Sequence, residues 1–294
     1  MRIALTANPQ KPAALDLARR GIARLDGRAD LVLAEETADA IRSDLPRAPL
    51  EAIDADVLVA IGGDGTFLAA LQRTRLPLLP VNAGTFGFLA EVDAGAGPSF
   101  EEALDRLLEG RYLLEERMKL ASAVGADNFP DATNEVVVHT SQVAKMRLFE
   151  IGVDGGVIGR LRADGIILAT PTGSTSYALS TQGPILDPTI EAIVITAVAP
   201  FQTAPRAVVV DPLRSVSVRL VLPDKDGTVV IDGHHEAKVP GGTIVTAYRS
   251  PRHALFVRFG SHFFRQLKGK GVLPWAADAG EEDAPDDADL PPPA

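Results

Sequence analysis

The sequence feature that most constrains the fold is an apolar run that ends in glycines and a single carboxylate. Residues 57–61 are apolar, and Gly-Gly-Asp-Gly-Thr follows at residues 62–66. Such a run predicts a buried strand that opens into a tight loop, where glycines let the backbone approach a ligand closely. Residues 67–74 are expected to form a helix, whose N-terminal N–H groups favour phosphate. We therefore predict phosphoryl transfer, with Asp64 handling a proton or a metal ion. A plain turn explains the loop about equally well if it is considered alone.

The first part of the chain predicts a parallel sheet. Strands are expected at residues 3–7, 31–34, 57–61 and 78–81, and helices at 12–25, 67–74 and 100–108. Strands that alternate with helices form βαβ units, and ligands bind at the carboxyl ends of the strands in such sheets. Asp64 follows one such end, and Asn82, which opens a second glycine-bearing turn, follows the next. The prediction is an α/β domain with a Rossmann-like parallel sheet.

From about Tyr112 the pattern changes to short β-rich runs separated by Gly, Pro and Asp. They lie at residues 118–124, 135–139, 147–153, 166–169, 192–198, 207–210, 215–222, 228–232 and 243–247, with a last strand expected at 254–259 and a short helix at 262–268. This spacing predicts a mostly antiparallel, all-β C-terminal domain of the sandwich or prism type.

The pattern divides the chain into four parts. We expect an α/β domain at residues 1–113, a β-rich domain at 114–253 and a segment at 254–274 that returns to the N-terminal domain. Residues 275–294 mix acidic residues, Ala and Pro without periodicity, so they are expected to be disordered.

Composition excludes several classes of protein. The formal net charge is −10, but seven acidic residues and no basic ones lie in residues 275–294, so the rest of the chain is nearly neutral and wholesale nucleic-acid binding is disfavoured. The absence of cysteine excludes disulfides and thiolate metal sites. The chain shows no signal-peptide pattern and no apolar run of about 20 residues, so we expect a cytoplasmic protein without a membrane span.

Two polar pairs in the β-rich part are candidates for ligand binding. Asn134 and Glu135 stand at the entrance of a valine-rich strand, where a turn cap is the commoner explanation. Arg162 and Asp164 precede another apolar strand, and a surface ion pair of little energetic value would also explain them. Neither pair identifies a ligand when it is considered alone.

A third candidate is the segment at residues 170–180, in which seven side chains carry hydroxyls. Hydroxyls bind sugars, phosphates or the edge of an adenine, and Tyr177 is available for stacking or hydrogen bonding. Linkers are often rich in Ser and Thr, but they do not normally lie between an apolar strand and an apolar pair such as Ile185-Leu186. Ligand binding is therefore the favoured interpretation of this segment.

Other sequence patterns are missing. The chain has no G-x-x-x-x-G-K-[ST] and no G-x-G-x-x-G, which excludes a P-loop enzyme and the dinucleotide fingerprint. Its five histidines show no metal-ligand spacing. His234 and His235 follow Asp232-Gly233 in a predicted turn. They could equally be exposed loop residues without a role in ligand binding.

Taken in order, these clusters resemble the bacterial NAD kinase family. Gly-Gly-Asp-Gly-Thr is shared by a superfamily that also includes diacylglycerol and sphingosine kinases and 6-phosphofructokinases. The resemblance is narrowed by N-x-G-x-x-G-F-L at residues 82–89, by Asn134-Glu135, and by the long block from residue 162 to residue 185. It spans about residues 1–270.

The resemblance implies a two-domain protein with the site in the crevice between the domains, in which the β-rich domain at 114–253 binds NAD, and an assembly as a homodimer or homotetramer. Its reaction would transfer a phosphoryl group from ATP, or in some members from inorganic polyphosphate, to the 2′-hydroxyl of the adenosine ribose of NAD. Asp64 would be the proton acceptor, and Mg²⁺ would be held mainly through the phosphates, with no metal ligand implied in the protein. Gly62, Gly63, Gly65 and Thr66 would form the phosphate-proximal loop. The nucleotide-binding residues would be Asp64, Gly65, Asn134, Glu135, Lys145, Arg162, Asp164, Thr175, Ser176, Tyr177, Ala178, Leu179, Ser180 and His234, and the contacts of Arg162 and Asp164 can come from a neighbouring subunit.

The sequence also departs from the family pattern. Gln182 stands where the family commonly has Gly, Ser176 stands where Ala is usual, and residues 200–206 differ from the usual sequence. These departures concern donor or substrate preference and subunit contacts rather than the reaction. Two rivals stay open: a kinase of the same loop class that acts on a lipid or sugar phosphate, and a non-catalytic nucleotide sensor.

Overall fold

The computed structural model describes residues 1–84, 87–93, 98–142, 144–201, 205–260 and 263–272. The tail at 275–294, which was predicted to be disordered, lies outside the described residues. So do residues 202–204, within one of the stretches that depart from the family pattern. In the described part of the chain, no helix is long and apolar enough to cross a membrane.

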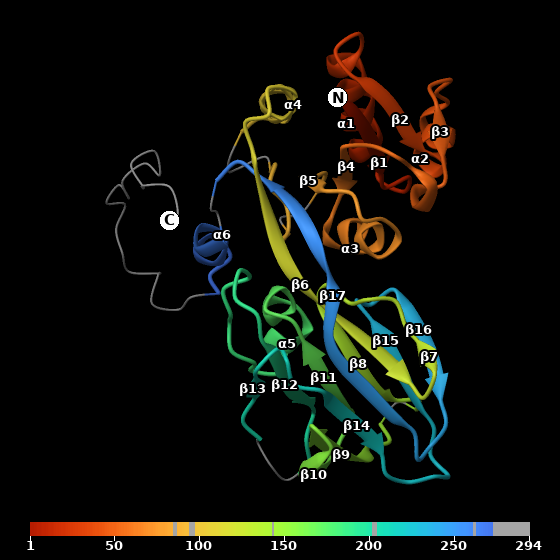
Figure 1. Cartoon of the computed structure of the whole chain (residues 1–294), viewed down its shortest axis with the longest axis vertical. Coiled ribbons are helices and arrows are strands. Elements are labelled where there is room, and N and C mark those ends of the chain that lie inside the picture. Colours follow the sequence, from red (N-terminus) through yellow and green to blue (C-terminus); the bar gives the residue numbers. More distant parts are fainter. Residues whose placement is uncertain (85–86, 94–97, 143, 202–204, 261–262, 273–294) are drawn as a thin grey trace.

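The first part of the chain is a parallel sheet with helices on both faces (Figure 1). Its strands pair in the order β5-β4-β1-β2-β3, and every pair is parallel. The strands are β1 (Arg2–Ala7), β2 (Asp30–Ala34), β3 (Arg47–Ala48), β4 (Val57–Gly62) and β5 (Leu78–Asn82); the helices are α1 (Pro12–Leu25), α2 (Glu35–Ile41), α3 (Asp64–Arg73) and α4 (Phe100–Leu108), with a 3₁₀ turn η1 at Leu50–Ala52. The predicted α/β architecture is confirmed.

The strand before the glycine loop is buried over its whole length. All six residues of β4 are buried. Val57 and Val59 pack with α1 and α4, whereas Leu58 and Ala60 pack with α3 on the other face. A strand covered on both sides needs a continuous apolar run, which is why this run is so plain in the sequence.

The second part of the chain packs two antiparallel layers face to face. One layer is a six-stranded sheet in the order β13-β12-β11-β8-β15-β16, and the other contains β10, β9, β14, β17 and β6. Apolar side chains of both layers form one buried core. The elements are β6 (Leu113–Val124), β7 (Asp127–Asn128), β8 (Glu135–Thr140), β9 (Arg147–Val153), β10 (Gly156–Ala163), β11 (Gly165–Ala169), η2 (Thr172–Thr175), α5 (Tyr177–Ser180), β12 (Ile193–Val198), β13 (Val208–Val210), β14 (Val216–Leu220), β15 (Gly227–Ile231), β16 (His235–Val239), β17 (Ile244–Arg258) and α6 (Phe263–Gly269). The predicted sandwich-like fold is confirmed.

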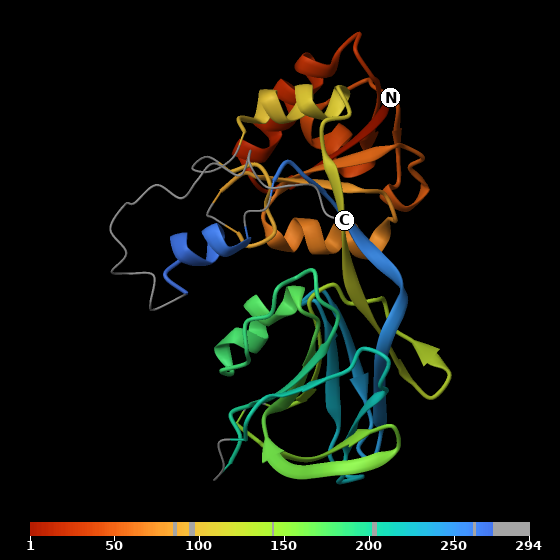
Figure 2. The same cartoon turned by 60° about the vertical axis from the view of Figure 1, so that its left-hand side comes forward.

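One long strand joins the two parts. Strand β17 pairs with β14 and β6 in the β-rich part, and its residue Phe256 pairs in parallel with Leu78 of β5. Figure 2 shows β6 and β17 running together from one part to the other. We expected two separate strands here, at residues 243–247 and 254–259, and that prediction is wrong. The strand passes Pro251 with a shift of register between Arg249 and His253.

The predicted boundary between residues 253 and 254 falls inside β17. Residues 254–258 nevertheless lie against β6, and Phe256 lies against β5 of the α/β part. The division of the chain into domains stays a prediction.

Several elements differ from expectation. Helix α3 begins at Asp64 rather than at residue 67, because Thr66 N and Phe67 N already donate to Gly63 O at 2.8 and 3.2 Å. The sequence pattern also missed α2, β3, β10 and β16. Strand β10 carries two glycines and is largely exposed at a sheet edge, so it lacks the apolar alternation that identifies a strand.

Candidate active site

The carboxylate of Asp64 is held at the start of α3 by two backbone amides. Phe88 N donates to its Oδ2 at 2.8 Å, and Leu89 N donates to its Oδ1 at 3.3 Å. A Cβ on Gly87 would lie 2.0 Å from Asp64 Oδ1, so the chain can pass this close only because residue 87 is glycine. The side chain is half-buried rather than sealed. Asp64 therefore keeps a fixed direction and an open side.

The glycines before and after Asp64 leave room for tight packing. A Cβ on Gly62 would lie 2.3 Å from the hydroxyl oxygen of Thr66, so that side chain can fold back over the strand end only if residue 62 is glycine. The same hydroxyl accepts hydrogen bonds from Gly63 N at 3.5 Å and from Asn8 Nδ2 at 3.4 Å. Thr66 thus supports the loop from behind.

The ammonium group of Lys11 lies over this loop, although the sequence did not single it out. Its Nζ is 3.4 and 3.2 Å from the positions that Cβ atoms would take on Gly63 and Gly84. Among the residues that the structure describes, Lys11 makes no ion pair. Lys11 also lines a cavity of about 470 Å³ together with Gly63, Gly65, Thr66 and other residues. It follows strand β1, and its place after a carboxyl end of the sheet is the signal that could have found it.

A second carboxylate organises the Asn134-Glu135 pair. Asp232 is 5% exposed and accepts hydrogen bonds from the backbone N–H groups of three consecutive residues, Thr133, Asn134 and Glu135, at 2.8, 2.7 and 3.1 Å. Gln72 Nε2 on α3 donates to the same carboxylate at 3.3 Å. The helix that begins at Asp64 is therefore linked through the Asp232 carboxylate to the turn that presents Asn134. The sequence pattern predicted no role for Asp232.

His234 lies between the two parts of the molecule. Its ring atoms Cε1 and Nε2 are both 3.5 Å from the position that a Cβ would take on Gly65. His234 also lines the 470 Å³ cavity. The predicted residues Gly65 and His234, which are far apart in the sequence, thus lie side by side.

Asn134 and Glu135 are buried with polar atoms that have no partner in the protein. The exposed fractions are 7% for Asn134 and 5% for Glu135. Asn134 Oδ1, Glu135 Oε2 and the hydroxyl of Thr172 accept or donate no hydrogen bond within the described residues. Buried polar atoms are normally paired, so an unpaired group of this kind fits a ligand with several hydroxyls or amides. Burial, and then the charge of Asp232, raise the pKa of Glu135 to about 8.

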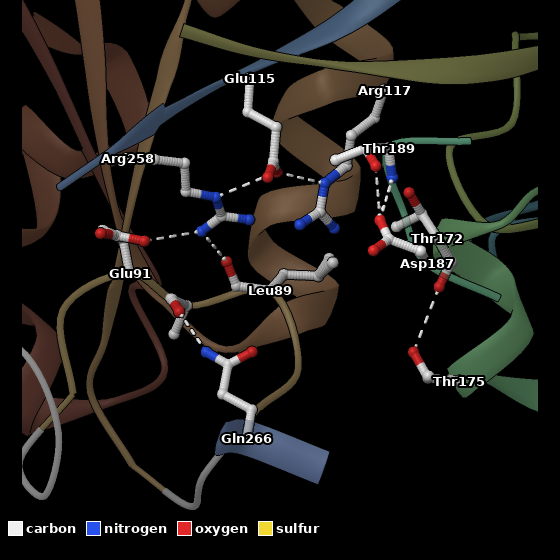
Figure 3. Close-up of polar contacts among 11 residues, drawn as sticks. Leu89, Glu91, Glu115, Arg117, Thr172, Thr175, Asp187, Thr189, Arg258 and Gln266 are labelled. Atoms are coloured by element: carbon white, nitrogen blue, oxygen red, sulfur yellow. Dashed lines mark hydrogen bonds and ion pairs between the residues drawn. The ribbon is translucent and has the colours of Figure 1, made fainter. Parts of the chain in front are cut away.

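The hydroxyl-rich segment forms two short helices, η2 and α5, rather than an open loop. Most of its hydroxyls bond within the protein: Thr170 Oγ1 donates to Thr133 O at 2.6 Å, Ser174 Oγ to Pro171 O at 2.6 Å, Thr175 Oγ1 to Thr172 O at 3.2 Å and Ser180 Oγ to Tyr177 O at 2.8 Å. Figure 3 includes the Thr175–Thr172 contact. These hydroxyls shape the segment, and few of them are left to face a ligand.

This segment also fixes the Asn134-Glu135 turn. A Cβ on Gly173 would lie 2.1 Å from Asn134 O, so the two backbones touch. Ser176 Oγ lies 3.4 Å from Glu135 Oε1. The exposed fraction of Tyr177 is 39%, and Leu179 is half-buried, whereas Ala178 is fully buried in a small apolar cluster. Thr175 is buried and Ser180 is exposed. Tyr177 is thus the large side chain of this segment that is open to a ligand.

Three predicted residues lie away from this group. Asp164 stands at the start of β11, where Gly165 pairs with His139, whereas Ala169 at the other end of β11 pairs with Glu135. The length of a strand therefore separates Asp164 from Glu135. Arg162 and Lys145 are exposed, and among the described residues Arg162 and Asp164 form no ion pair. Asp164 Oδ1 is buried without a partner.

The residues that the structure describes contain no group of three or more His, Asp or Glu side chains that could hold a metal ion. A carboxylate such as Asp64 is a suitable oxygen donor for Mg²⁺, but one carboxylate does not form a site. The arrangement fits an ion that reaches the site bound to phosphate, and this stays a prediction.

Comparisons with known proteins agree with this architecture. Residues 3–112 match the ATP-NAD kinase N-terminal domain, and residues 133–259 match the ATP-NAD kinase C-terminal domain. The chain is 38% identical to the NAD kinase of Methanothermobacter thermautotrophicus over 92% of this chain and 96% of the relative. It is 42% identical to that of Methanopyrus kandleri over 76% of this chain and 79% of the relative.

Two solved structures resemble the whole molecule. The yeast NADH kinase complexed with NADH has a TM-score of 0.84 at 21% identity and covers 96% of this chain and 90% of its own. The NAD kinase from Archaeoglobus fulgidus in complex with ATP has a TM-score of 0.71 at 28% identity and covers 92% of this chain and 98% of its own. With both domain models matched and relatives above 30% identity over nearly full length, this chain belongs to the NAD kinase family.

Proposed function

We propose that the chain transfers the γ-phosphoryl group of ATP to the 2′-hydroxyl of the adenosine ribose of NAD⁺, giving ADP and NADP⁺. The observation that carries this proposal is the position of Asp64 at the glycine-lined N-terminus of α3, a helix whose Gln72 is hydrogen-bonded to Asp232, the carboxylate that holds the buried Asn134-Glu135 turn. The ATP complex of the Archaeoglobus fulgidus relative and the NADH complex of the yeast relative support the two substrate classes.

Asp64 acts as the general base. A ribose hydroxyl is a very weak acid, so a carboxylate within hydrogen-bond reach accepts its proton while the new bond forms between the 2′-oxygen and the γ-phosphorus. The bond between that phosphorus and the β–γ bridging oxygen breaks, and ADP leaves with its electron pair. The backbone amides of Phe88 and Leu89 fix the direction of the Asp64 carboxylate.

Charge neutralisation comes from three sources around the loop. The N–H groups at the start of α3 favour phosphate oxygens. Lys11, whose ammonium lies beside Gly63 and Gly84, binds the donor phosphates. A bound Mg²⁺ supplies further positive charge to the triphosphate. Gly62, Gly63, Gly65 and Thr66 keep the loop narrow enough for these groups to converge.

The acceptor is bound by the β-rich part. The unpartnered Asn134 Oδ1 and the carboxyl of Glu135 take the hydroxyls of NAD, and Tyr177 stacks on or borders a ring, with Thr175, Ser176, Ala178, Leu179 and Ser180 shaping the pocket around it. His234 closes the space beside Gly65. Lys145, Arg162 and Asp164 lie at the far end of β11, so we assign them to the site of a neighbouring subunit in a homodimer or homotetramer.

A substrate panel tests the proposal. Purified protein is incubated with Mg²⁺ and ATP or inorganic polyphosphate, and each donor is offered NAD⁺, NADH, diacylglycerol and fructose 6-phosphate. The expected result is NADP⁺ formation from ATP and NAD⁺ and no phosphorylation of the lipid or the sugar phosphate. NAD binding without any NADP⁺ formation would instead identify a sensor and overturn the proposal.

A further inference from the structure

The segment at residues 87–92, which we call the strap, lies between Asp64 and a buried cluster of charged side chains. On one side, Phe88 N and Leu89 N donate to the Asp64 carboxylate. The far end of the strap is bonded to β5, because Glu91 N donates to Pro80 O at 2.9 Å and Asn82 N donates to Val92 O at 2.8 Å. The direction of the Asp64 carboxylate therefore depends on where the strap is held.

The other side of the strap is held by Arg258, the last residue of β17 (Figure 3). Arg258 is 7% exposed. Its Nη1 donates to the backbone oxygen of Leu89 and to Glu91 Oε2, both at 3.1 Å. The residue Leu89 is thus fixed from two directions: its N–H faces Asp64 and its C=O faces Arg258. The Arg258 side chain therefore links β17, the strand that joins the two parts of the molecule, to the strap that orients the Asp64 carboxylate.

The guanidinium of Arg258 has little freedom to move. Its Nε donates to Glu115 Oε1 at 3.1 Å, and Arg117 Nε donates to the same oxygen at 2.7 Å. Both guanidinium carbons lie over the ring of Phe256, at 4.9 Å for Arg258 and 4.7 Å for Arg117. Burial alone would raise the pKa of Glu115, but the charges of the two arginines outweigh it and lower that pKa. The two arginines and the carboxylates of Glu115 and Glu91 therefore form a largely buried cluster of opposite charges, and these charge-assisted hydrogen bonds fix its geometry.

Two further hydrogen bonds hold the strap, one to a side chain of the strap and one to its backbone. Glu91 Oε1 accepts a hydrogen bond from Phe259 N at 2.6 Å. Gln266 Nε2 on α6, the residue labelled Gln266 in Figure 3, donates to Ala90 O at 2.9 Å. Of these contacts, the one from Arg258 reaches the peptide next to Asp64. Arg117 shares the ring and the carboxylate with Arg258 and lies within electrostatic range of Glu91, but among the described residues it donates no hydrogen bond to the strap. The two arginines thus differ in one relevant respect.

We propose that Arg258 is a positioning residue for Asp64: it holds the strap so that the carboxylate points at the acceptor hydroxyl. This inference rests on the proposed role of Asp64 as general base. It also explains why β17 runs through both parts, since the same strand pairs with β14 and β6 of the NAD-binding part and ends at the strap. Strand β17 therefore helps to position both the acceptor site and Asp64.

The test compares Arg258→Met with Arg117→Met, because methionine keeps an unbranched stem over Phe256 in both and removes the donors. We expect Arg258→Met to lower kcat about 100-fold, the loss that a misplacement of about 1 Å can cause, with KM for NAD⁺ and ATP changed less than about threefold. Arg117→Met should unfold at a similarly reduced denaturant concentration but keep kcat within about threefold. Equal losses of kcat in the two variants would overturn the proposal, because they would trace the effect to general destabilisation.

Two further variants keep the outcome clear. Arg258→Lys retains a donor that can reach Leu89 O, so its kcat should lie between those of wild type and Arg258→Met, and a kcat no higher than that of Arg258→Met would count against the proposal. If Arg258→Met does not fold, Arg258→Gln, whose shorter side chain cannot span the distance to Leu89 O, takes its place, and a wild-type kcat in Arg258→Gln overturns the proposal. In Asp64→Asn, adding Arg258→Met should cause little further loss, because the two residues act as a unit. An active Asp64→Asn would refute the base itself, whereas an inactive Asp64→Asn beside a fully active Arg258→Met would refute only the positioning role.

Discussion

Asp64 and Asp232 are both held by consecutive backbone N–H groups, yet their surroundings differ. Asp64 accepts two such bonds at the start of α3 and is half-buried. Asp232 accepts three, takes a fourth from Gln72 and is 5% exposed. The same arrangement, a carboxylate bound by consecutive backbone N–H groups, thus occurs once at a partly exposed position and once at a buried one.

We interpret this difference as that between the proposed general base, Asp64, and a structural carboxylate, Asp232. Backbone donors favour the ionised form of a carboxylate, whereas desolvation opposes it. In Asp232 burial raises the pKa against the effect of its four donors, and these donors occupy its lone pairs, so this group can organise a turn but cannot reach a substrate proton. Asp64 retains an open side. Isosteric Asn substitutions should therefore affect turnover at one position and architecture at the other.

The largest effect is expected for Asp64→Asn. An amide cannot accept the proton of the 2′-hydroxyl, so kcat should fall by about 100-fold to 10,000-fold, the usual contribution of a general base. NAD⁺ affinity should change little, because Asn keeps the size of the side chain. A coupled NADP⁺ assay and calorimetric titration with NAD⁺ measure the two quantities. Turnover close to wild type would show that Asp64 is not the base.

Asp232→Asn should reverse that pattern. Its amide NH₂ would face backbone N–H groups that now donate to a carboxylate, so we expect a loss of about 2–3 kcal/mol in the free energy of unfolding. KM for NAD⁺ should rise because the Asn134-Glu135 turn loosens, while kcat falls less than in Asp64→Asn. Urea unfolding and initial-rate kinetics measure these changes.

Asp154→Asn is the matched control for Asp232→Asn. Asp154 also accepts a backbone hydrogen bond, from Ser215 N at 3.0 Å, but on the exposed surface. Its substitution should change the free energy of unfolding by less than about 0.5 kcal/mol. Equal destabilisation by the two substitutions would contradict the organising role of Asp232.

A smaller effect is expected for Lys11→Ala, which tests the donor side of the site. Loss of the ammonium beside Gly63 and Gly84 should raise KM for ATP roughly tenfold, equivalent to about 1.4 kcal/mol, and leave KM for NAD⁺ unchanged. Lys238→Ala, which removes an exposed lysine of β16, is the control. A rise in KM for NAD⁺ instead of ATP would place Lys11 on the acceptor side.

The sequence predicted those parts of the fold that depend on local pattern. Helix α4 was predicted with its exact bounds, because its apolar face is regular and Ser99 caps it by accepting Glu102 N at 3.2 Å. Strand β4 was recognised from its unbroken apolar run. The sequence did not predict that β17 continues through Pro251, since proline normally ends a strand. The register shift between Arg249 and His253 accommodates this proline.

The candidate site was less accessible from sequence where contacts are long-range. Asp64 was found because glycines surround it, but Asp232 and Arg258 act on backbone groups 97 and 169 positions away, and no local pattern reports such contacts. The hydroxyls of residues 170–180 suggested a ligand surface, whereas most of them bond to nearby backbone oxygens. Composition alone does not distinguish a hydroxyl that shapes a turn from one that faces a substrate.

The smallest expected effect is on the pH dependence of stability, and it concerns Glu135, the buried carboxyl beside Asp232. Because the pKa of Glu135 is raised from 4.5 to about 8 in the folded chain, the unfolded chain loses this proton first as pH rises. The contribution of Glu135 to stability is therefore fully present below about pH 4.5 and is lost progressively up to about pH 8. Glu135→Gln mimics the neutral carboxyl, so its urea midpoint should fall less than that of wild type between these values, with Asp232, whose pKa is also raised, retaining part of the slope. Identical slopes in the two proteins would show that Glu135 is ionised in the folded state.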